Sequence, residues 1–165
     1  MNITFTPIGT IHTPYTKKKN NTPFQSIEDD KEEFFVTVYP EHVKRLEKLD
    51  LFTYIYLIYY LDQTYKEPKD LVHPPWTKNT AVGLFASRSP NRINPIGLSV
   101  VKIKEIKENQ ISISGIDAFD GTPLLDIKPY IKDLDAKTDA NYGWLEDAKF
   151  KDHLLLHIKG IPHDH

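Results

Sequence analysis

Cysteine is absent from this 165-residue sequence. The absence excludes a disulfide framework and any metal site built on thiolates, and it agrees with a reducing compartment. Long hydrophobic runs are missing too: the most apolar stretch, residues 51–61, is too short to span a bilayer. The N-terminus has no basic segment followed by an apolar one, so it does not resemble a secretory signal. We therefore expect a cytoplasmic protein with no membrane partner.

A basic excess is also lacking. Lysine and arginine number 21 against 23 aspartate and glutamate residues, which gives a formal net charge of −2. Dedicated RNA-binding modules usually carry excess positive charge, because phosphate neutralisation supplies much of their affinity. Any RNA contact must therefore come from local patches such as Lys17–Lys19, or Arg88 together with Arg92. The lysine run can equally be a solvated loop.

The chain is long enough for one domain with a real hydrophobic core. We predict a single domain over residues 1–165, with a core at about 5–145 and a tail at about 151–165. Many strand-like runs and few helical patterns indicate a mainly β fold, a single antiparallel β-barrel with a few short helices. Residues 52–61 are almost wholly aromatic or aliphatic, which predicts a strand buried on both faces. The expected strands are 3–13, 34–39, 52–61, 81–85, 96–106, 110–119 and 124–128, and the expected helices are 41–49 and 142–149.

Two polar loops stand out between the hydrophobic runs. The segment Phe85–Ser99 contains two Arg, two Pro and two Asn, and Asp117–Tyr130 is rich in Asp, Gly and Pro. A plain connection needs turn residues only, whereas fixed cations and amides can hold an anionic or highly polar ligand. Each loop lies beside a β-branched run, so the sequence predicts one ligand site built from strand ends.

These two loops, the opening Pro7–Pro14 and the aromatic run at 51–60 resemble the TsaA-like, or TrmO-type, proteins in order and separation. The resemblance covers about residues 5–145. It implies a homodimeric S-adenosylmethionine-dependent methyltransferase on a small β-barrel. The methyl acceptor it implies is adenine N6 of a modified adenosine next to a tRNA anticodon.

The resemblance also implies a set of cofactor-binding residues. The sequence departs from the family pattern where Phe24 replaces Arg and Asp62 replaces His, and Ile93 stands where the family favours Pro. Gly121 lies in a tight turn that calls for a positive φ angle, and the exposed amides of this turn could hold polar groups of a ligand. The cofactor residues implied are Pro23, Phe24, Gln25, Asp62, Gln63, Arg88, Leu98, Phe119, Asp120, Gly121 and Thr122.

Methyl transfer to an exocyclic amine is an in-line displacement, so positioning can matter more than a strong base. Acceptors that bond the amine hydrogens help, and Asn94 is the first candidate, with Asp126 and Tyr130 as second choices. For RNA contact we expect Arg92 and Lys128, with Tyr130 also able to stack on a base.

Several alternatives stay open. Arg88 could instead form an ion pair that ties two loops, and Asp62 could be a strand-end turn residue. The 126–130 block could be a strand end with a proline stop. The protein could also bind the cofactor or RNA without catalysis, or methylate a small molecule.

Seven histidines raise the question of a metal. His153 and His157 are four residues apart and could share a helix face. No acidic third ligand has a convincing spacing, so we predict no functional metal site.

Overall fold

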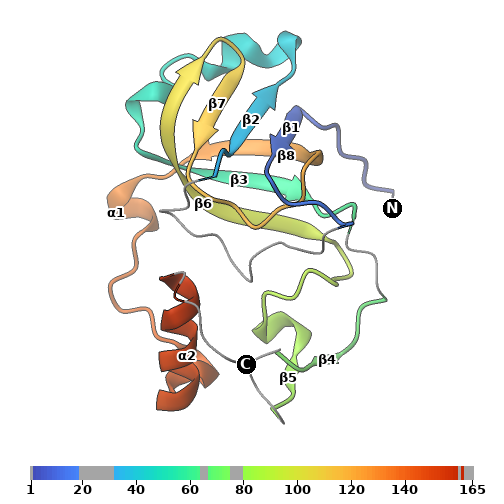
Figure 1. The fold of residues 1–165 in the computed structure, drawn as a ribbon, viewed down its shortest axis with the longest axis vertical. Coiled ribbons are helices and arrows are strands. Elements are labelled where there is room, and N and C mark those ends of the chain that lie inside the picture. Colours follow the sequence, from blue (N-terminus) through green and yellow to red (C-terminus); the bar gives the residue numbers. More distant parts are fainter. Residues whose placement is uncertain (1, 19–31, 64–66, 75–79, 160, 162–165) are drawn as a thin grey trace.

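The barrel is the main element of the fold in this computed structural model, which describes residues 2–18, 32–63, 67–74, 80–159 and 161 (Figure 1). Within these ranges six strands pair in a closed antiparallel ring, in the order β1-β2-β7-β6-β3-β8. The predicted mainly β fold with few helices is confirmed. The barrel strands are β1 (Gly9–His12), β2 (Phe35–Val38), β3 (Tyr54–Tyr60), β6 (Ile96–Lys107), β7 (Gln110–Ile113) and β8 (Thr122–Pro129).

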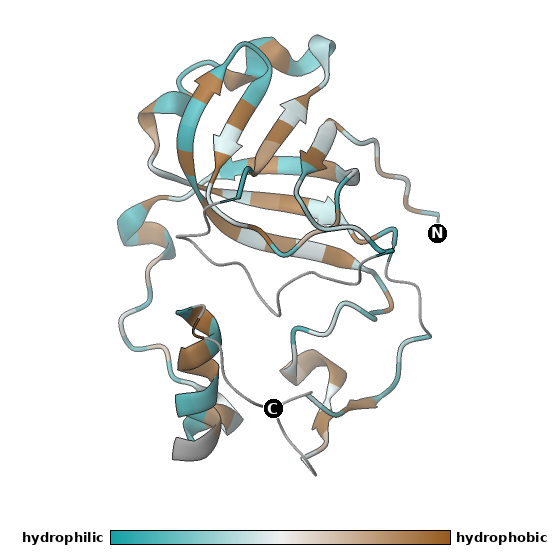
Figure 2. Ribbon diagram, viewed as in Figure 1, coloured by the Kyte–Doolittle hydropathy of each residue, from teal (hydrophilic) through white to brown (hydrophobic). Residues whose placement is uncertain are grey.

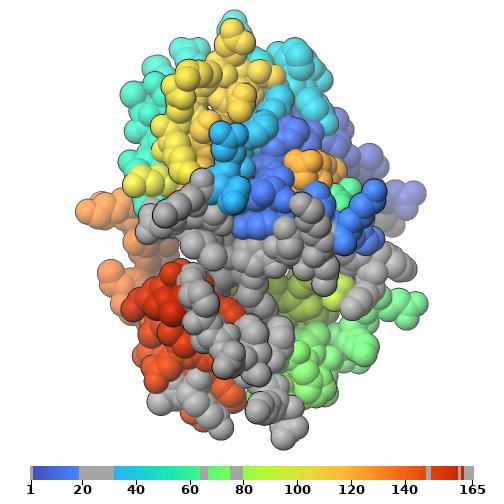
Figure 3. Space-filling view, in the orientation of Figure 1, coloured from blue at the N-terminus to red at the C-terminus, as the bar shows by residue number. Residues whose placement is uncertain are grey.

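The remaining elements lie mostly in the other half of the molecule. There α2 (Ala148–Ile158) lies on one side of the molecule, and a separate pair of short strands, β4 (Leu71–Val72) and β5 (Val82–Gly83), lies on the other (Figure 1). Figure 3 shows the same division on the molecular surface, with α2 in red and the β4–β5 region in green. The short helices are η1 (Pro40–Leu46), η2 (Leu49–Leu51), η3 (Leu84–Ala86), α1 (Lys132–Asp135) and η4 (Gly143–Glu146). In the described residues no helix has the length and apolar character that a membrane crossing requires.

The barrel interior forms the hydrophobic core, because alternate residues of each strand point inward. Figure 2 shows this alternation of hydrophobic and hydrophilic residues along the strands. The core includes Ile11, Val36, Val38, Ile55, Leu57, Val101, Ile111, Ile113 and Leu124, all no more than 1% exposed.

The prediction that residues 52–61 are buried on both faces is wrong. In β3, Ile55, Leu57 and Tyr59 are buried, whereas the residues between them are only half-buried or exposed. A barrel strand has a single interior face, so an apolar side chain on the other face must meet solvent or a partner. The outward residues of β3 therefore belong to the outer surface of the barrel, where Tyr54 and Tyr56 pack against Tyr130.

The helical predictions hold only in part. The segment expected as a helix at 41–49 forms 3-10 turns, which begin at Pro40 and are interrupted at Lys48 with φ 66°. At the other end, α2 extends to Ile158, well into the segment that we expected to be a tail. His153 and His157 do share a face of α2, with 3.0 Å between their Nε2 atoms.

Candidate functional site

Three strand ends meet at one end of the barrel. β3 ends where β6 begins, with Tyr60 opposite Ile96, and Tyr59 lies opposite Leu124 near the start of β8. The Leu61 N–H donates to the Pro95 carbonyl over 2.8 Å. The segments that follow β3 and precede β6 and β8 therefore converge, as a ligand site built from strand ends requires.

The backbone N–H groups of the turn before β8 already make hydrogen bonds within the protein. Gly121 has φ 82°, so the predicted positive φ is confirmed. The N–H groups of Asp120, Gly121 and Thr122 donate to the carbonyls of Tyr15, Ile11 and Phe119, respectively. The Thr122 hydroxyl, buried inside the barrel, also donates to Phe119 O at 2.7 Å. These turn amides are therefore engaged in internal hydrogen bonds, and the turn also presents carboxylate and carbonyl oxygens; its contact with a ligand stays a prediction.

Asp120 joins this turn to β1 and to the segment after β3. Its Oδ1 atom accepts a hydrogen bond from Thr13 N at 3.3 Å and lies 3.4 Å from His12 Nδ1. Its carbonyl accepts from Gln63 Nε2 at 3.0 Å, so two of the implied cofactor segments are in direct contact. The sequence reasoning missed His12, which stacks on Phe35 at 4.5 Å between ring centroids, although it lies inside the Pro7–Pro14 block.

Behind the turn lies a buried polar network. The Tyr59 hydroxyl is 2.9 Å from Ser99 Oγ and donates to Asp117 Oδ1 at 3.4 Å. Ser99 Oγ also donates to Asp117 Oδ1 at 3.4 Å. Burial, followed by the nearby Asp117 carboxylate, raises the pKa of Tyr59 well above its ordinary value. Tyr59 therefore stays neutral and can donate to the segment that leads into the turn.

The outer face of β6, β3 and β8 carries several predicted site residues. Leu98, Ile58 and Asp126 lie opposite one another in a row across the three strands. Leu98 is 61% exposed, a large value for a leucine on a strand. The Asp126 carboxylate pairs with Lys128 at 2.7 Å, and Lys128 lies opposite Tyr56. The run of apolar residues at 52–61 does not indicate that Ile58 and Tyr56 lie on this face rather than in the core.

The three predicted catalytic residues do not surround one point. Tyr130 comes four residues after Asp126, about 13 Å along an extended strand. Its N–H donates to Tyr54 O at 3.1 Å, and its ring packs against Tyr56 at 5.6 Å. Asn94 lies at the opposite end of this face, where its carbonyl accepts from Ile96 N at 2.7 Å. Asn94 and Asp126 are therefore nearer the strand ends that converge than Tyr130 is.

The two arginines of the 85–99 loop have different surroundings. Arg92 Nη1 donates to the carbonyls of Leu84 at 3.3 Å and Ser87 at 2.9 Å, so Arg92 holds the loop in shape. Arg88 is exposed and forms no ion pair with any residue that the structure describes, which argues against a structural ion pair for it. Asp62 is exposed, and its N–H donates to Tyr60 O at 2.9 Å, as in a strand-end turn.

Two further predictions concern the 23–25 segment and a metal site. Pro23, Phe24 and Gln25 lie outside the described residues. In the described ranges no group of three or more His, Cys, Asp or Glu is placed to hold a metal ion.

Comparisons with known proteins find similarity to one family. The family model described as the tRNA-methyltransferase O N-terminal domain matches residues 10–136. A relative from Pyrococcus abyssi, named a probable S-adenosyl-L-methionine-binding protein, is 40% identical over 144 residues, which cover 87% of this chain and 77% of the relative. The mouse tRNA (adenine(37)-N6)-methyltransferase is 38% identical over 98 residues, which cover 59% of this chain and 22% of the mouse protein.

Solved structures agree with these sequence matches. The crystal structure of TrmO from Pseudomonas aeruginosa superposes with a TM-score of 0.69 at 31% identity. That match covers 87% of this chain but 62% of the Pseudomonas chain, so this chain spans less than two thirds of that protein.

Proposed function

This chain belongs to the tRNA-methyltransferase O N-terminal domain family, and we propose that it methylates adenine N6 in tRNA with S-adenosylmethionine as donor. The observation that carries the proposal is that Gln63, Pro95 and Asp120, one from each of the segments 62–63, 88–98 and 119–122, meet at one end of the barrel. These are the segments in which the family resemblance implies cofactor contacts. The match to the family over residues 10–136 spans all three of them.

The residues of these segments fit the chemical groups of the cofactor. Arg88 offers an exposed cation without an ion-pair partner among the described residues, suited to a carboxylate. Leu98 offers an exposed apolar surface. Asp120 and the carbonyl groups of its turn offer acceptors for an ammonium group or for hydroxyls. When bound, the cofactor would supply an electrophilic methyl group.

We propose that this chain contributes positioning rather than a strong base. The adenine amine is a weak nucleophile, and acceptors on its hydrogens orient its lone pair. Asn94 and Asp126 carry suitable oxygens on the side of the face nearest the cofactor loops. Lys128 and Tyr130, farther along β8, are suited to an RNA phosphate and a stacked base. Arg92 remains a predicted RNA contact, although its Nη1 atom already binds its own loop.

We also propose a homodimer with the outer face of β6 and β3 at its interface. Leu98, Val100 and Ile96 are 61%, 44% and 37% exposed, and Tyr60 beside Ile96 is 42% exposed. Contiguous exposed apolar side chains of this kind favour association. Because Leu98 belongs to the same face, a second copy seated there would lie beside the cofactor site.

A second candidate function is cofactor binding without methyl transfer. It is favoured by the Pyrococcus relative, whose name refers to S-adenosyl-L-methionine binding only. The net charge of −2 also leaves a small-molecule acceptor open. The cytoplasmic location stays a prediction.

One experiment separates these functions. The protein is incubated with isotope-labelled S-adenosylmethionine and tRNA from a strain that lacks the endogenous enzyme, and the digested nucleosides are analysed by mass spectrometry. We expect label on an N6-modified adenosine. If donor binding is demonstrated but tRNA gains no label, the methyltransferase proposal fails and the binding or small-molecule function is favoured.

A further inference from the structure

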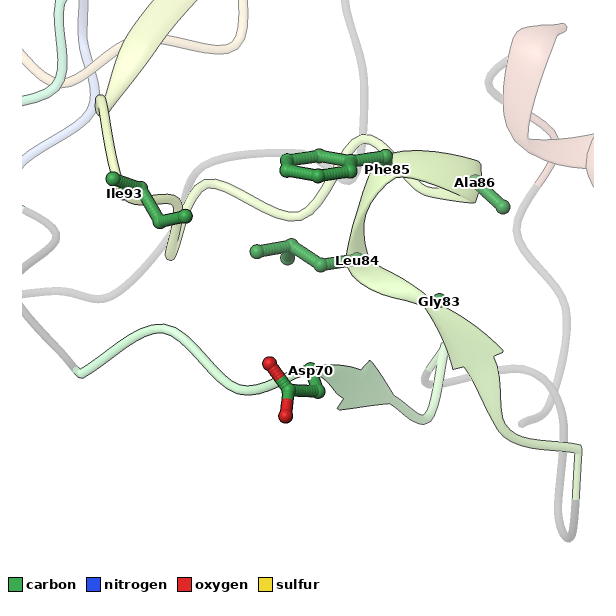
Figure 4. Close-up of a pocket in the computed structure, with 6 residues that line it drawn as sticks. All are labelled: Asp70, Gly83, Leu84, Phe85, Ala86 and Ile93. Carbon is green, nitrogen blue, oxygen red and sulfur yellow. The ribbon is translucent and has the colours of Figure 1, made fainter.

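A pocket opens beside the loop that carries Arg88 and Asn94. Its volume is about 250 Å³, and its lining comes from β5, η3 and two loop residues (Figure 4). This is below the roughly 300–1,000 Å³ typical of pockets that bury a drug-sized ligand. The size suits a single planar ring system rather than a whole nucleotide. The lining residues are Asp70, Gly83, Leu84, Phe85, Ala86 and Ile93.

The pocket walls are apolar and open to solvent. Leu84 is 6% exposed, whereas Phe85 and Ile93 are 80% and 67% exposed. Figure 4 shows these three side chains converging on the same space. Large apolar side chains left exposed around a hollow indicate a binding surface, and an open phenylalanine ring is a face on which a nucleobase can stack.

Asp70 adds a hydrogen-bond acceptor to these walls. Its carbonyl accepts from Leu84 N at 2.9 Å, and Leu71 pairs with Gly83, so the β4–β5 pairing fixes Asp70 beside Leu84. In Figure 4 the carboxylate lies beneath the Leu84 side chain. An ionised carboxylate only accepts hydrogen bonds, so it favours a ring that carries an amine donor.

Arg92 gives the pocket its shape. Its guanidinium carbon lies 5.8 Å from the centre of the Phe85 ring, and its Nη1 atom binds the carbonyls of Leu84 and Ser87. The ring and the loop are therefore held from one side by a fixed cation.

We propose that this pocket receives an unpaired nucleobase of the RNA substrate, stacked on Phe85 against Ile93 with its exocyclic amine toward Asp70. The inference rests on the proposed function for the identity of the substrate. It is supported by chain continuity, because Ile93 in the pocket wall directly precedes Asn94. A base held here would contact the loop that also carries Asn94.

Methyl NMR of the full chain tests occupancy of the pocket directly. We expect adenosine monophosphate to shift the Ile93 and Leu84 methyl signals through its ring current. Purine riboside monophosphate, which lacks the amine, should bind roughly tenfold more weakly because one charge-assisted hydrogen bond is missing. Asp70→Ala should abolish that difference, and Asp50→Ala, at an exposed carboxylate in η2, should not. Unshifted signals, or equal binding of the two nucleotides by the wild type, would overturn the proposal.

Steady-state kinetics with tRNA supply a second readout. Phe85→Ala should raise KM for tRNA about tenfold, from one lost base–aromatic stack, with KM for S-adenosylmethionine unchanged. Phe85→Tyr keeps the ring and should behave like the wild type. Leu51→Ala is a second control that should leave KM for tRNA unchanged, because it removes a similarly exposed side chain, 75% exposed, outside the pocket.

The two proposals fail in different ways. If the wild type methylates tRNA and Phe85→Ala does so equally well, the pocket proposal falls and the methyltransferase function stands. If the wild type does not methylate tRNA, the proposed function falls, and the nucleotide titration alone decides whether the pocket binds a base.

Discussion

At the scale of single residues, the hydroxyl of Tyr59 connects the barrel core to the proposed cofactor turn. It reaches Ser99 and Asp117 from a side chain that is only 3% exposed. Asp117 begins the segment that leads to Asp120 and Gly121. A buried hydroxyl without partners would be costly, so these three residues fix one another and stiffen the start of the turn.

Tyr59→Phe should lower the free energy of unfolding by about 1–2 kcal/mol near pH 7, because Ser99 and Asp117 lose a buried partner. The pH dependence gives a sharper test. The ordinary tyrosine pKa is 10.0, and the folded protein raises the pKa of Tyr59 above that value. Above pH 10 the unfolded chain therefore releases a proton that the folded chain keeps, and stability falls as pH rises.

The slope from this group approaches about 1.4 kcal/mol per pH unit. Urea denaturation from pH 7 to 11 should show a flatter decline for Tyr59→Phe than for the wild type, since the other eight of the nine tyrosines are common to both. Parallel curves would mean that Tyr59 ionises as easily in the folded state as in the unfolded one.

At the scale of elements, the strands were predictable and the helices less so. The runs at 96–106 and 110–119 alternate or are rich in β-branched residues, and they correspond to β6 and β7, although β7 already ends at Ile113. Residues 41–49 have helical spacing but only half-buried apolar positions, and they wind as 3-10 turns. The length of α2 exceeds the prediction, because polar residues interrupt the helical spacing of its apolar residues. The segment also ends in clustered histidines, which are typical of a tail.

Gly97 shows how closely β6 and β3 approach. A Cβ atom at this position would overlap the ring of Tyr59, its partner on β3. Gly97→Ala should therefore cost about 1–3 kcal/mol of folding free energy, since the buried ring has to shift from its hydrogen bonds.

Gly83→Ala is the matched control for this prediction. A Cβ atom there meets nothing within 4 Å, and the expected change stays within about 0.5 kcal/mol. Chemical denaturation of both variants makes the comparison. Equal stabilities of Gly97→Ala and Gly83→Ala would contradict the close approach of β3 and β6 at Gly97.

At the scale of the whole molecule, the sequence indicated which loops form the site but not how they are arranged on the barrel. Two polar loops beside β-branched runs predicted a site at strand ends, and the pairing of Gln63 with Asp120 supports it. The register across β6, β3 and β8 was not predictable, because a one-residue shift would turn every side chain to the other face. For that reason the separation of Tyr130 from Asn94 could not be foreseen.

Self-association is a prediction at the same scale. If the outer face of β6 forms the interface, the wild type should be a dimer by light scattering at tens of micromolar. Val100→Asp places a charge at a 44% exposed apolar position of this face and should yield a monomer that keeps its circular dichroism spectrum. A wild type that is monomeric at these concentrations contradicts the proposed interface.

The central claim is that the loops meeting at the ends of β3, β6 and β8 bind S-adenosylmethionine. Calorimetric titration of the wild type, Arg88→Ala and Arg45→Ala with this ligand tests it most directly. Arg45 is an exposed arginine in η1 and serves as the matched control.

The account predicts saturable 1:1 binding per chain by the wild type and by Arg45→Ala. Arg88→Ala should bind about tenfold more weakly, because a charge-assisted bond of about 1.5 kcal/mol is lost. Failure of the wild type to bind S-adenosylmethionine would contradict the account, and so would equal weakening in both arginine variants.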